Sequence, residues 1–250
     1  MNALLLLLLD SRAPAGAHHH SAGMEAAVMT GLVTDLAGTE DFCQTRLRTS
    51  ARVAASFAAA SCRLFSAERA GLDPTLLSAE QNGLDPTLPA ELAVLDAEYE
   101  ARVPSEAARR ASRELGRGLG RLLRSVLASL DRAETDLGMA FSRCAGPAPH
   151  HPLVLGASVA LAGGDPELAG RAAALGACAG PASAALRLLG LDPFAVHAML
   201  ARLAPGVDEC AAFAAGCAGW PPSALPAHGA PALDLLADYH LTAEVRLFAS

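Results

Sequence analysis

The sequence contains no lysine and no isoleucine, and only 4% of its residues are aromatic. Without lysine, no P-loop amine can contact a nucleotide phosphate and no amine can form a Schiff base with a substrate. The absence of isoleucine, together with little valine, leaves few of the β-branched residues that favour strands. These absences exclude P-loop nucleotide hydrolysis and Schiff-base catalysis, and they disfavour a β-rich fold.

Familiar catalytic and metal-binding motifs are also missing. The chain has no G-x-S-x-G elbow and no H-E-x-x-H pair. Its six cysteines include no C-x-x-C pair, which excludes a zinc knuckle or a thioredoxin-type site at that spacing. We expect buried free thiols, with Cys210 and Cys217 on one face of a helix, as suits a reducing cytoplasm.

Charge and hydropathy restrict the partners. The net charge of −7 argues against general nucleic-acid binding. The run Leu4–Leu9 lacks a basic flank and ends at Asp10, so it does not resemble a signal peptide. Glycine, proline or charge interrupts the other apolar stretches, so we expect no transmembrane helix and a cytoplasmic location. The mean hydropathy of +0.30 indicates apolar interfaces with other proteins.

Hydrophobic residues make up 52% of the chain, and alanine and leucine supply most of them. Both favour helix, so the sequence predicts an all-α, single-domain helical bundle spanning residues 1–250. The hexapeptide at 71–76 (GLDPTL) recurs at 83–88. A single duplication is too short for a solenoid, so we interpret 71–90 as a surface-loop insertion. Residues 231–250 are expected to form a C-terminal tail that binds partners.

Hydrophobic periodicity and helix-end signals predict the elements in order. The first 30 residues predict a short helix, a turn and a second helix capped by Ser21. Asp-Pro pairs mark two further helix starts, and Pro205-Gly206 should end the second of these helices. The remaining expected helices and segments cover 39–69, 105–131, 152–163, 166–189, 193–203 and 233–248.

The helix expected at 105–131 has three distinct features. Apolar positions 108, 111, 115, 119, 122, 126 and 130 predict its buried face. Arg113, Arg117, Arg121 and Arg124 form a line on another face, which is either a solvated surface or a docking surface for an acidic partner. Gly116 and Gly120 are four residues apart, and their cost to the helix indicates that another backbone approaches closely there.

A run of histidines supplies the main candidate metal ligands. His18 and His20, in the run His18-His19-His20, could hold nickel or zinc, although a solvated or structural turn is the simpler interpretation. His150-His151 is expected to begin a helix. His197 and His240 are expected to pack or to form hydrogen bonds.

Three stretches together resemble the urease accessory protein UreF family. The N-terminal stretch is D-S-R-A-P-A-G at 10–16 followed by S-A-G-M-E at 21–25. The second combines R-A-S at 110–112 and Gly116 with H-P-L-V-L-G at 151–156. The third is P-A-L-D at 231–234, then His240 and R-L-F-A-S at 246–250, and S-A-A-L-R-L at 183–188 adds to the likeness. The order and spacing of these motifs cover nearly the whole chain.

The resemblance implies an all-helical, dimeric chaperone subunit that is not an enzyme and needs no cofactor. It implies assembly with UreD (also called UreH) and the GTPase UreG on apo-urease, where GTP hydrolysis drives nickel insertion. The motif residues are the implied partner-binding residues. They are Pro14, Gly16, Ser21, Glu25, Arg110, Ser112, Arg187, His240, Arg246, Phe248 and Ser250.

Some positions depart from the family pattern. Ala17, His18 and His20 stand where an aromatic residue is common, and Pro193 and His197 replace the usual glutamines. Two alternatives remain open from the residues alone. One is a helical dimerisation scaffold unrelated to urease, and the other is a small metal-binding helical enzyme that uses His18, His20, His151 or His240.

Overall fold

The computed structural model describes residues 3–10, 20–71, 88–129, 149–242 and 248 of the chain. Every regular element in these ranges is helical and none is a strand, which confirms the all-α prediction. The helices are α1 (Ala3–Leu9), α2 (Met24–Met29), α3 (Leu36–Arg48), α4 (Ser50–Gly71), α5 (Leu88–Ala101), α6 (Glu106–Ser129), α8 (His151–Leu161), α9 (Pro166–Leu189), α10 (Pro193–Cys217), the 3-10 turn η2 (Pro222–Ala224) and α11 (Pro231–Thr242).

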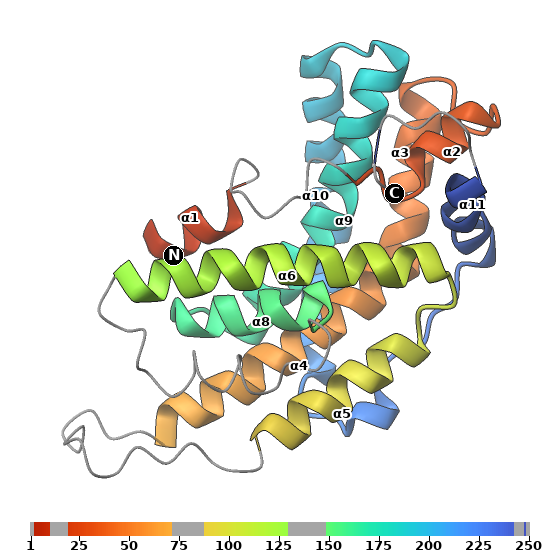
Figure 1. Ribbon diagram of the computed structural model, residues 1–250. Coiled ribbons are helices and arrows are strands. Elements are labelled where there is room, and N and C mark those ends of the chain that lie inside the picture. The colour runs from red at the N-terminus through yellow and green to blue at the C-terminus, as the bar shows by residue number, and fades with distance from the viewer. Residues whose placement is uncertain (1–2, 11–19, 72–87, 130–148, 243–247, 249–250) are drawn as a thin grey trace.

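The arrangement is centred on α4, which runs diagonally through the molecule (Figure 1). It packs against α8, α9 and α10. The long α6 crosses in front of α8, and α2, α3 and α11 gather on one side (Figure 1). The helices far apart in the sequence therefore share one core, and Phe57 and Phe65 of α4 are its largest fully buried side chains.

Small residues allow the central helices to approach closely. A Cβ on Gly156 of α8 would lie 2.2 Å from the carbonyl oxygen of Ala58 and 2.8 Å from the amide nitrogen of Cys62. Both neighbours are backbone atoms of α4, so no side-chain rotation could relieve the overlap. The alanine-rich composition thus serves close helix packing rather than helix propensity alone.

The Asp-Pro signals give the expected helix starts. Asp165 and Asp192 cap α9 and α10 with their carboxylates, and proline follows each in the first turn. Gly190 has a positive φ of 65° and ends α9, as a left-handed C-cap requires. The start of α8 at His151 also agrees with the sequence.

Two predicted boundaries are wrong. The single helix expected at 39–69 is two helices, because Thr49 leaves the helical region with φ −127° and ψ −103°. The helix expected to end at 203 continues through Pro205 to Cys217. The missing hydrogen bond at Pro205 is costly, but the second half of α10 buries Val207 and Cys210, which stabilises the continued helix.

The face of α6 that is most buried lies beside the predicted one. Of the six predicted positions that the structure describes, Leu119 is the one buried residue, whereas 108, 111, 115, 122 and 126 are half-buried. The deep positions are Ala107, Ser112, Gly116, Gly118, Leu119, Gly120, Leu123 and Leu127. Glycine and serine carry little hydrophobic signal, so the hydrophobic periodicity selected a helix face that is rotated slightly from the most deeply buried one.

Among the described residues, α9 is the one helix long and apolar enough to cross a membrane by length and composition. It packs against α3, α4, α8 and α10. A central core helix of this kind passes the same test, so the finding is weak evidence for a membrane span.

The described cysteines are Cys43, Cys62, Cys178, Cys210 and Cys217, and all five are buried and free. Cys210 and Cys217 lie on one buried face of α10, as predicted. The duplicated insertion lies almost wholly outside the described residues, because 72–87 are not described. The division into one domain, an insertion and a tail stays a prediction.

Candidate partner-binding site

The two ends of the chain meet in a small cluster of apolar side chains, called here the terminal cluster. It is separate from the main core and joins α2, α3, α9 and Phe248, which lies near the C-terminal end of the sequence. Its buried members are Met24, Ala27, Val33, Phe42, Ala184, Ala185 and Phe248. Two of the motif stretches that sequence analysis singled out, at the N- and C-terminal ends, therefore form one structure.

Glu25 connects the two ends directly. Its side chain is buried, with the residue only 2% exposed, and its Oε2 accepts the backbone N–H of Phe248 at 3.2 Å. The backbone N–H of Glu25 in turn donates to the Oγ of buried Ser21 at 3.4 Å. The carboxylate near the start of the chain thus fixes the backbone near its end.

Arg187 covers the outer side of the same cluster. Its guanidinium carbon lies 4.7 Å from the centroid of the Phe248 ring, a cation–π contact. Its Nε donates to the carbonyl of Ser183 at 3.3 Å, one turn back on α9. Ser21, Glu25, Arg187 and Phe248, four residues selected from sequence motifs, are therefore brought together.

The chain enters α2 through two residues with positive φ, Ala22 at 53° and Gly23 at 87°. Gly23 caps α2 in place of the predicted Ser21. Arg46 of α3 holds this turn by donating to the carbonyl oxygens of Ala22 at 3.2 Å and Ala177 at 2.9 Å. Desolvation lowers the pKa of Arg46 from its ordinary value. Sequence analysis missed Arg46, because only the fold brings residues 22, 46 and 177 together.

The C-terminal helix α11 contacts two other helices. It packs against α2 and against α6. Asp238 of α11 accepts hydrogen bonds from the Oγ of Ser105 at 2.6 Å and from the backbone N–H of Ala107 at 3.1 Å. Asp238 therefore satisfies a free backbone donor at the start of α6, where a negative charge is favourable. Its role rests on a contact across 131 residues, for which the sequence carries no local signal.

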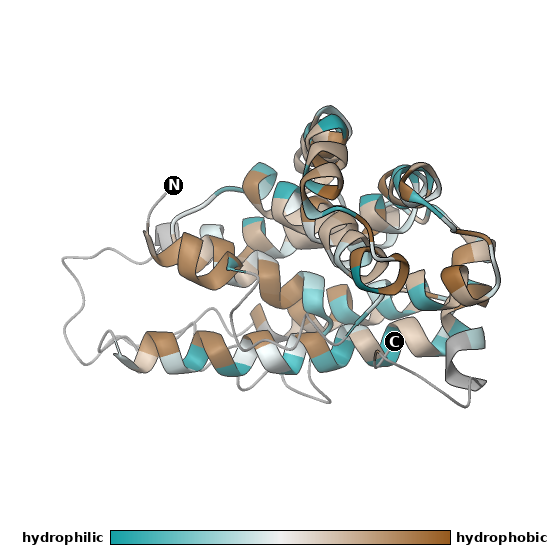
Figure 2. Cartoon of the chain, turned by 90° about the horizontal axis from the view of Figure 1, so that it is seen from above, coloured by the Kyte–Doolittle hydropathy of each residue, from teal (hydrophilic) through white to brown (hydrophobic). Residues whose placement is uncertain are grey.

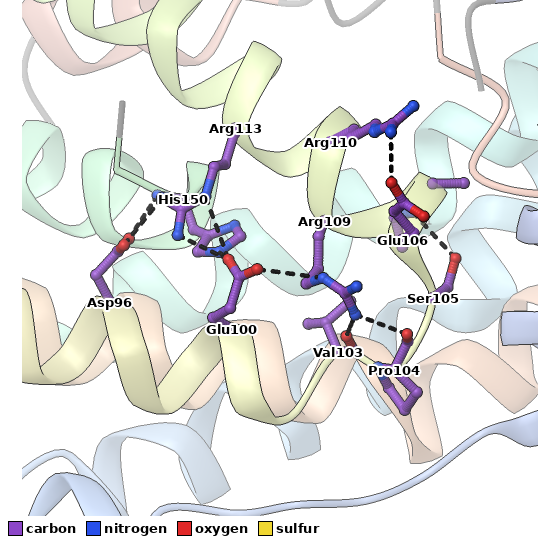
Figure 3. A network of polar contacts seen from close by, with 12 residues as sticks. Asp96, Glu100, Val103, Pro104, Ser105, Glu106, Arg109, Arg110, Arg113 and His150 are labelled. Carbon is purple, nitrogen blue, oxygen red and sulfur yellow. Dashed lines mark hydrogen bonds and ion pairs between the residues drawn. The ribbon is translucent and has the colours of Figure 1, made fainter. Parts of the chain in front are cut away.

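A second group of polar side chains lies between α5, α6 and the start of α8 (Figure 3). Glu100 accepts from the Nη2 of Arg113 at 2.7 Å and contacts the Nε2 of His150 at 2.6 Å. Asp96 accepts from the Nη1 of Arg113 at 2.9 Å and from the backbone N–H of His150 at 2.8 Å. Arg109 forms a further ion pair with Glu100 at 3.2 Å. We call these five residues the buried-histidine network.

The protonation states in this network follow from burial and partners. Desolvation lowers the pKa of His150 and outweighs its acidic neighbours. Desolvation would raise the pKa of Glu100, but hydrogen bonds from His150 and Arg113 lower it on balance. A neutral His150 thus donates Nε2–H to an ionised Glu100. Its Nδ1 is buried without a hydrogen-bond partner.

Ser112 and Arg110, the two other motif residues on α6, lie apart from the terminal cluster. The Oγ of Ser112 accepts the backbone N–H of His151 at 3.2 Å and so helps to place α8. Arg110 is exposed and pairs with Glu106 one turn earlier. Pro14, Gly16, Arg246 and Ser250 lie outside the described residues, as does the side chain of His240.

The line of four arginines is divided by the fold. Arg113 is turned inward into the buried-histidine network, and its side chain is only 19% exposed. The solvated or docking face predicted for it is therefore wrong. Arg117, Arg121 and Arg124 are exposed, as predicted. The signal that could have separated them is the pair Asp96 and Glu100, whose spacing matches that of Arg109 and Arg113 on the next helix.

The structure describes some of the histidines that are candidate metal ligands. His18 lies outside the described residues, and the Nε2 of His20 lies 3.9 Å from the Oε2 of Glu114. Desolvation, with His20 nearby, lowers the pKa of His151 to about 4. Within the described ranges, no group of three or more His, Cys, Asp or Glu side chains is arranged to hold a metal ion. His197 of α10 bonds the carbonyl of Pro193 at 2.9 Å, which is a structural contact.

The described polar clusters thus position helices and the chain ends. Apolar side chains are exposed around the terminal cluster, including Met29, Leu32, Leu235 and Tyr239. A helical scaffold that exposes apolar side chains in this way is typical of proteins that bind other proteins.

Comparison with known proteins identifies the family. The sequence model of the UreF family matches residues 33–204. The urease accessory protein UreF of Mycobacterium sp. (strain JLS) is 40% identical over 246 residues, covering 98% of this chain and 97% of its own. UreF of Mycolicibacterium vanbaalenii is 39% identical over 249 residues, covering 99% and 98%. UreF of Mycobacterium tuberculosis (strain ATCC 25177 / H37Ra) is 37% identical over 211 residues, covering 84% and 83%. The chain belongs to the UreF family of urease accessory proteins, which take part in urease maturation and are not enzymes.

Proposed function

We propose that this protein acts in urease maturation as a chaperone subunit that joins UreD (UreH) and the GTPase UreG on apo-urease. In that assembly, GTP hydrolysis by UreG drives nickel into the urease active site. The proposed subunit is a cytoplasmic homodimer, supplies no cofactor and has nickel only as cargo of the assembly. Membership of the UreF family supports this function, and the terminal cluster supports the mode of binding.

The observation that carries the mode of binding is the apolar surface around the joined ends of the chain. Leu32, which follows α2, is 68% exposed, and Leu235 of α11 is 71% exposed. Val28 of α2 and Leu233 and Leu236 of α11 pack against the terminal cluster, which supports these elements from the interior. The motif-bearing ends thus present apolar side chains on a supported surface, which is the composition expected where a partner docks.

Tyr239 of α11 and Met29 of α2 are also exposed, with exposed fractions of 52% and 53%. Aromatic residues and methionine are enriched at protein interfaces. Because α11 contacts both α2 and α6, a partner that binds to α2 and α11 requires the C-terminal helix to be docked in this position. We assign this face to UreD binding, with UreG joining the resulting complex.

Co-purification with UreD and UreG from the same organism tests the proposal. Leu235→Asp places a charge in the exposed apolar surface and should abolish capture of UreD. Val94→Asp on α5 is the matched control, because Val94 is also exposed, at 50%, but lies on a helix that carries none of the family motifs. Capture of UreD by the Leu235 variant at the wild-type level would refute this binding surface.

A urease deletion-complementation assay adds the functional readout. The wild-type chain and the Val94 variant should restore urease activity to a strain that lacks its own accessory subunit, and the Leu235 variant should not. Circular dichroism of each purified variant confirms that the fold is intact. Full restoration by a chain that binds neither UreD nor UreG would contradict the proposed assembly.

A further inference from the structure

Half of the arginines whose side chains the structure describes, seven of fourteen, form an ion pair with an acidic residue. Ion pairs join Arg52 to Glu209, Arg102 to Glu98, Arg109 and Arg113 to Glu100, Arg110 to Glu106, Arg171 to Glu167 and Asp208, and Arg202 to Glu40. Such pairing is expected in a chain whose acidic residues outnumber its arginines by 26 to 19. Among the exposed arginines of the described chain, Arg110 and Arg202 have such a partner, so an exposed arginine without a carboxylate is common, and the grouping of such arginines is what distinguishes one surface from another.

Three exposed arginines are grouped on α6, whereas Arg48, Arg63 and Arg187 lie on three different helices. Arg117, Arg121 and Arg124, called here the outer arginines, are all exposed, and no ion pair joins them to any residue in the described ranges. Their spacing of four and three residues places them in one row on the helix. At a rise of about 1.5 Å per residue, the row is roughly 10 Å long.

The nearest acidic residue on the helix does not neutralise this row. Glu114 is three residues before Arg117 and seven before Arg121, and no ion pair joins it to either arginine in the described ranges. Its carboxylate lies 3.9 Å from the Nε2 of His20. Between Arg117 and Arg124 the helix has three positive charges and no negative one. Like charges at these spacings repel, so the row weakens α6 in isolation.

The position of α6 makes the row available to a partner. The helix lies along one edge of the molecule, with hydrophilic residues recurring along its length (the long helix at the bottom of Figure 2). The opposite side of α6 is fixed by Leu119, Leu123 and Leu127 in the main core. The outer arginines are thus carried by a helix that is held rigidly from within.

We propose that the outer arginines form a docking surface for an acidic face of another protein, with carboxylates spaced as on one side of a helix. Arginine suits this role because its guanidinium binds a carboxylate through two parallel hydrogen bonds. A protein helix with acidic residues four and three positions apart matches the row in length and spacing. The occupant is a partner protein rather than a nucleic acid, because the whole chain carries a charge of −7 and repels a long polyanion.

This surface is distinct from the apolar surface around the terminal cluster. It adds an electrostatic contact that sets orientation and association rate, as complementary charges at an interface do. The identity of the partner rests on the proposed function, since UreD, UreG and apo-urease are the proteins against which it is tested.

The experiment compares two charge-matched double variants of the full-length protein. Arg117→Glu/Arg121→Glu reverses two outer arginines. Arg48→Glu/Arg63→Glu reverses two exposed arginines on α3 and α4 that also have no carboxylate partner among the described residues. Both pairs change the net charge equally, and glutamate and arginine have similar helix propensities, so both variants should fold. Circular dichroism and thermal unfolding check this.

Binding of each variant to UreD, UreG and apo-urease is measured separately across a salt series. We expect Arg117→Glu/Arg121→Glu to weaken binding to one of the three by about tenfold at low salt, and Arg48→Glu/Arg63→Glu to leave it unchanged. Wild-type affinity for that protein should fall with added salt more steeply than the affinity of the first variant.

Two results would overturn this proposal and leave the proposed function unaffected. One is equal affinity of the two double variants for all three proteins that the wild type binds. The other is a loss confined to binding of anionic lipid vesicles or of DNA, which would show that the row binds a different kind of polyanion. If the wild-type chain binds none of the three proteins, both this inference and the proposed function fail.

Discussion

The Oε2 of Glu25 accepts the backbone N–H of Phe248 at 3.2 Å, so a carboxylate near the start of the chain holds a residue near its end. Both residues are buried. A buried carboxylate is stable only where hydrogen bonds replace its hydration. The contact therefore makes one side chain of α2 contribute to the docking of the chain's end, beside the packing of Phe248 in the terminal cluster, and it couples the two segments that carry family motifs.

Removing this acceptor should loosen the C-terminal end. Glu25→Ala leaves the buried N–H of Phe248 without a partner, which costs about 1–3 kcal/mol. We expect faster hydrogen exchange at Phe248 and weaker urease activation. Glu209→Ala is the control, because that carboxylate is 77% exposed and pairs only with Arg52. Unchanged exchange at Phe248 in the Glu25 variant would show that the end of the chain docks without this contact.

The burial of Phe248 determines what shortening the chain should do. Residues 246–250 carry a family motif, and Phe248 among them is buried in the terminal cluster. Deleting 246–250 should therefore lower both urease activation and stability, the latter by up to about 3 kcal/mol, as for loss of a buried phenylalanine. Deleting only 249–250 leaves Phe248 in place and should retain the wild-type melting temperature. Equal melting temperatures for all three proteins would mean that Phe248 contributes nothing to the fold.

Replacing glycine with alanine should have opposite effects on stability at Gly116 and at Gly176. A Cβ on Gly116 would lie 2.0 Å from the carbonyl oxygen of Pro149 and 3.1 Å from the amide nitrogen of His151. Gly116→Ala should therefore destabilise the protein by at least about 1–3 kcal/mol, the usual cost of overpacking. A Cβ on Gly176 of α9 would meet nothing within 4 Å. Gly176→Ala should stabilise by about 0.5–1 kcal/mol.

Chemical denaturation of both variants measures the difference. The close approach at Gly116 was predicted from the cost of placing glycine in a helix, and the structure confirms it with the segment that starts α8. A Gly116→Ala protein as stable as Gly176→Ala would contradict the packing at that point.

The amount of the fold that the sequence could predict depends on the range of the interactions. Local signals sufficed for α9 and α10, because Asp165 and Asp192 act on their own first turns. They failed at Pro205, since the burial of Val207 and Cys210 that keeps α10 continuous comes from other helices. A local rule cannot include that stabilisation.

The candidate site shows the same division. Ser21, Glu25, Arg187 and Phe248 were found from family motifs, which select residues without explaining their contacts. Arg46 and Asp238 were missed because they act on backbone atoms distant in sequence, at Ala177 and Ala107. Backbone groups are the same at every position, so no pattern of side chains marks them in advance.

Stability should fall on mild acidification because two histidines near α8 have lowered pKa values. The pKa of His151 falls from an ordinary 6.5 to about 4, and that of His150 is also lowered. Below pH 6.5 the unfolded chain therefore binds protons that the folded chain does not. The stabilisation is complete above pH 6.5 and is lost as the pH falls toward 4, by up to about 1.4 kcal/mol per pH unit for each histidine.

Replacing one of these histidines should reduce that slope. His151→Gln removes one of the two groups, so the free energy of unfolding should depend less steeply on pH between 6.5 and 4. The wild-type chain is the reference for this comparison. Urea denaturation at several pH values measures both. A His151 variant with the wild-type slope would show that the ring titrates alike in the folded and unfolded chains.

Arg113 and Arg117 are one turn apart on α6, yet the same substitution should affect them differently. Arg113 is 19% exposed and binds both Asp96 and Glu100. Arg113→Glu would place a third carboxylate beside those two and remove their shared cation. Breaking a buried pair from one side costs about 3–5 kcal/mol, and since Glu100 is more exposed than Arg113, about 2–3 kcal/mol is the expected loss.

Arg117→Glu should change the free energy of unfolding by no more than about 0.5 kcal/mol, because Arg117 is exposed and forms no ion pair with the described residues. Thermal and urea denaturation of the two single variants make the comparison at equal charge change. If both variants unfold like the wild type, the ion pairs of Arg113 contribute nothing measurable, and the inward position of that side chain has no energetic basis. If both are destabilised equally, Arg117 has a structural partner, and a loss of partner binding in its variants could no longer be assigned to docking.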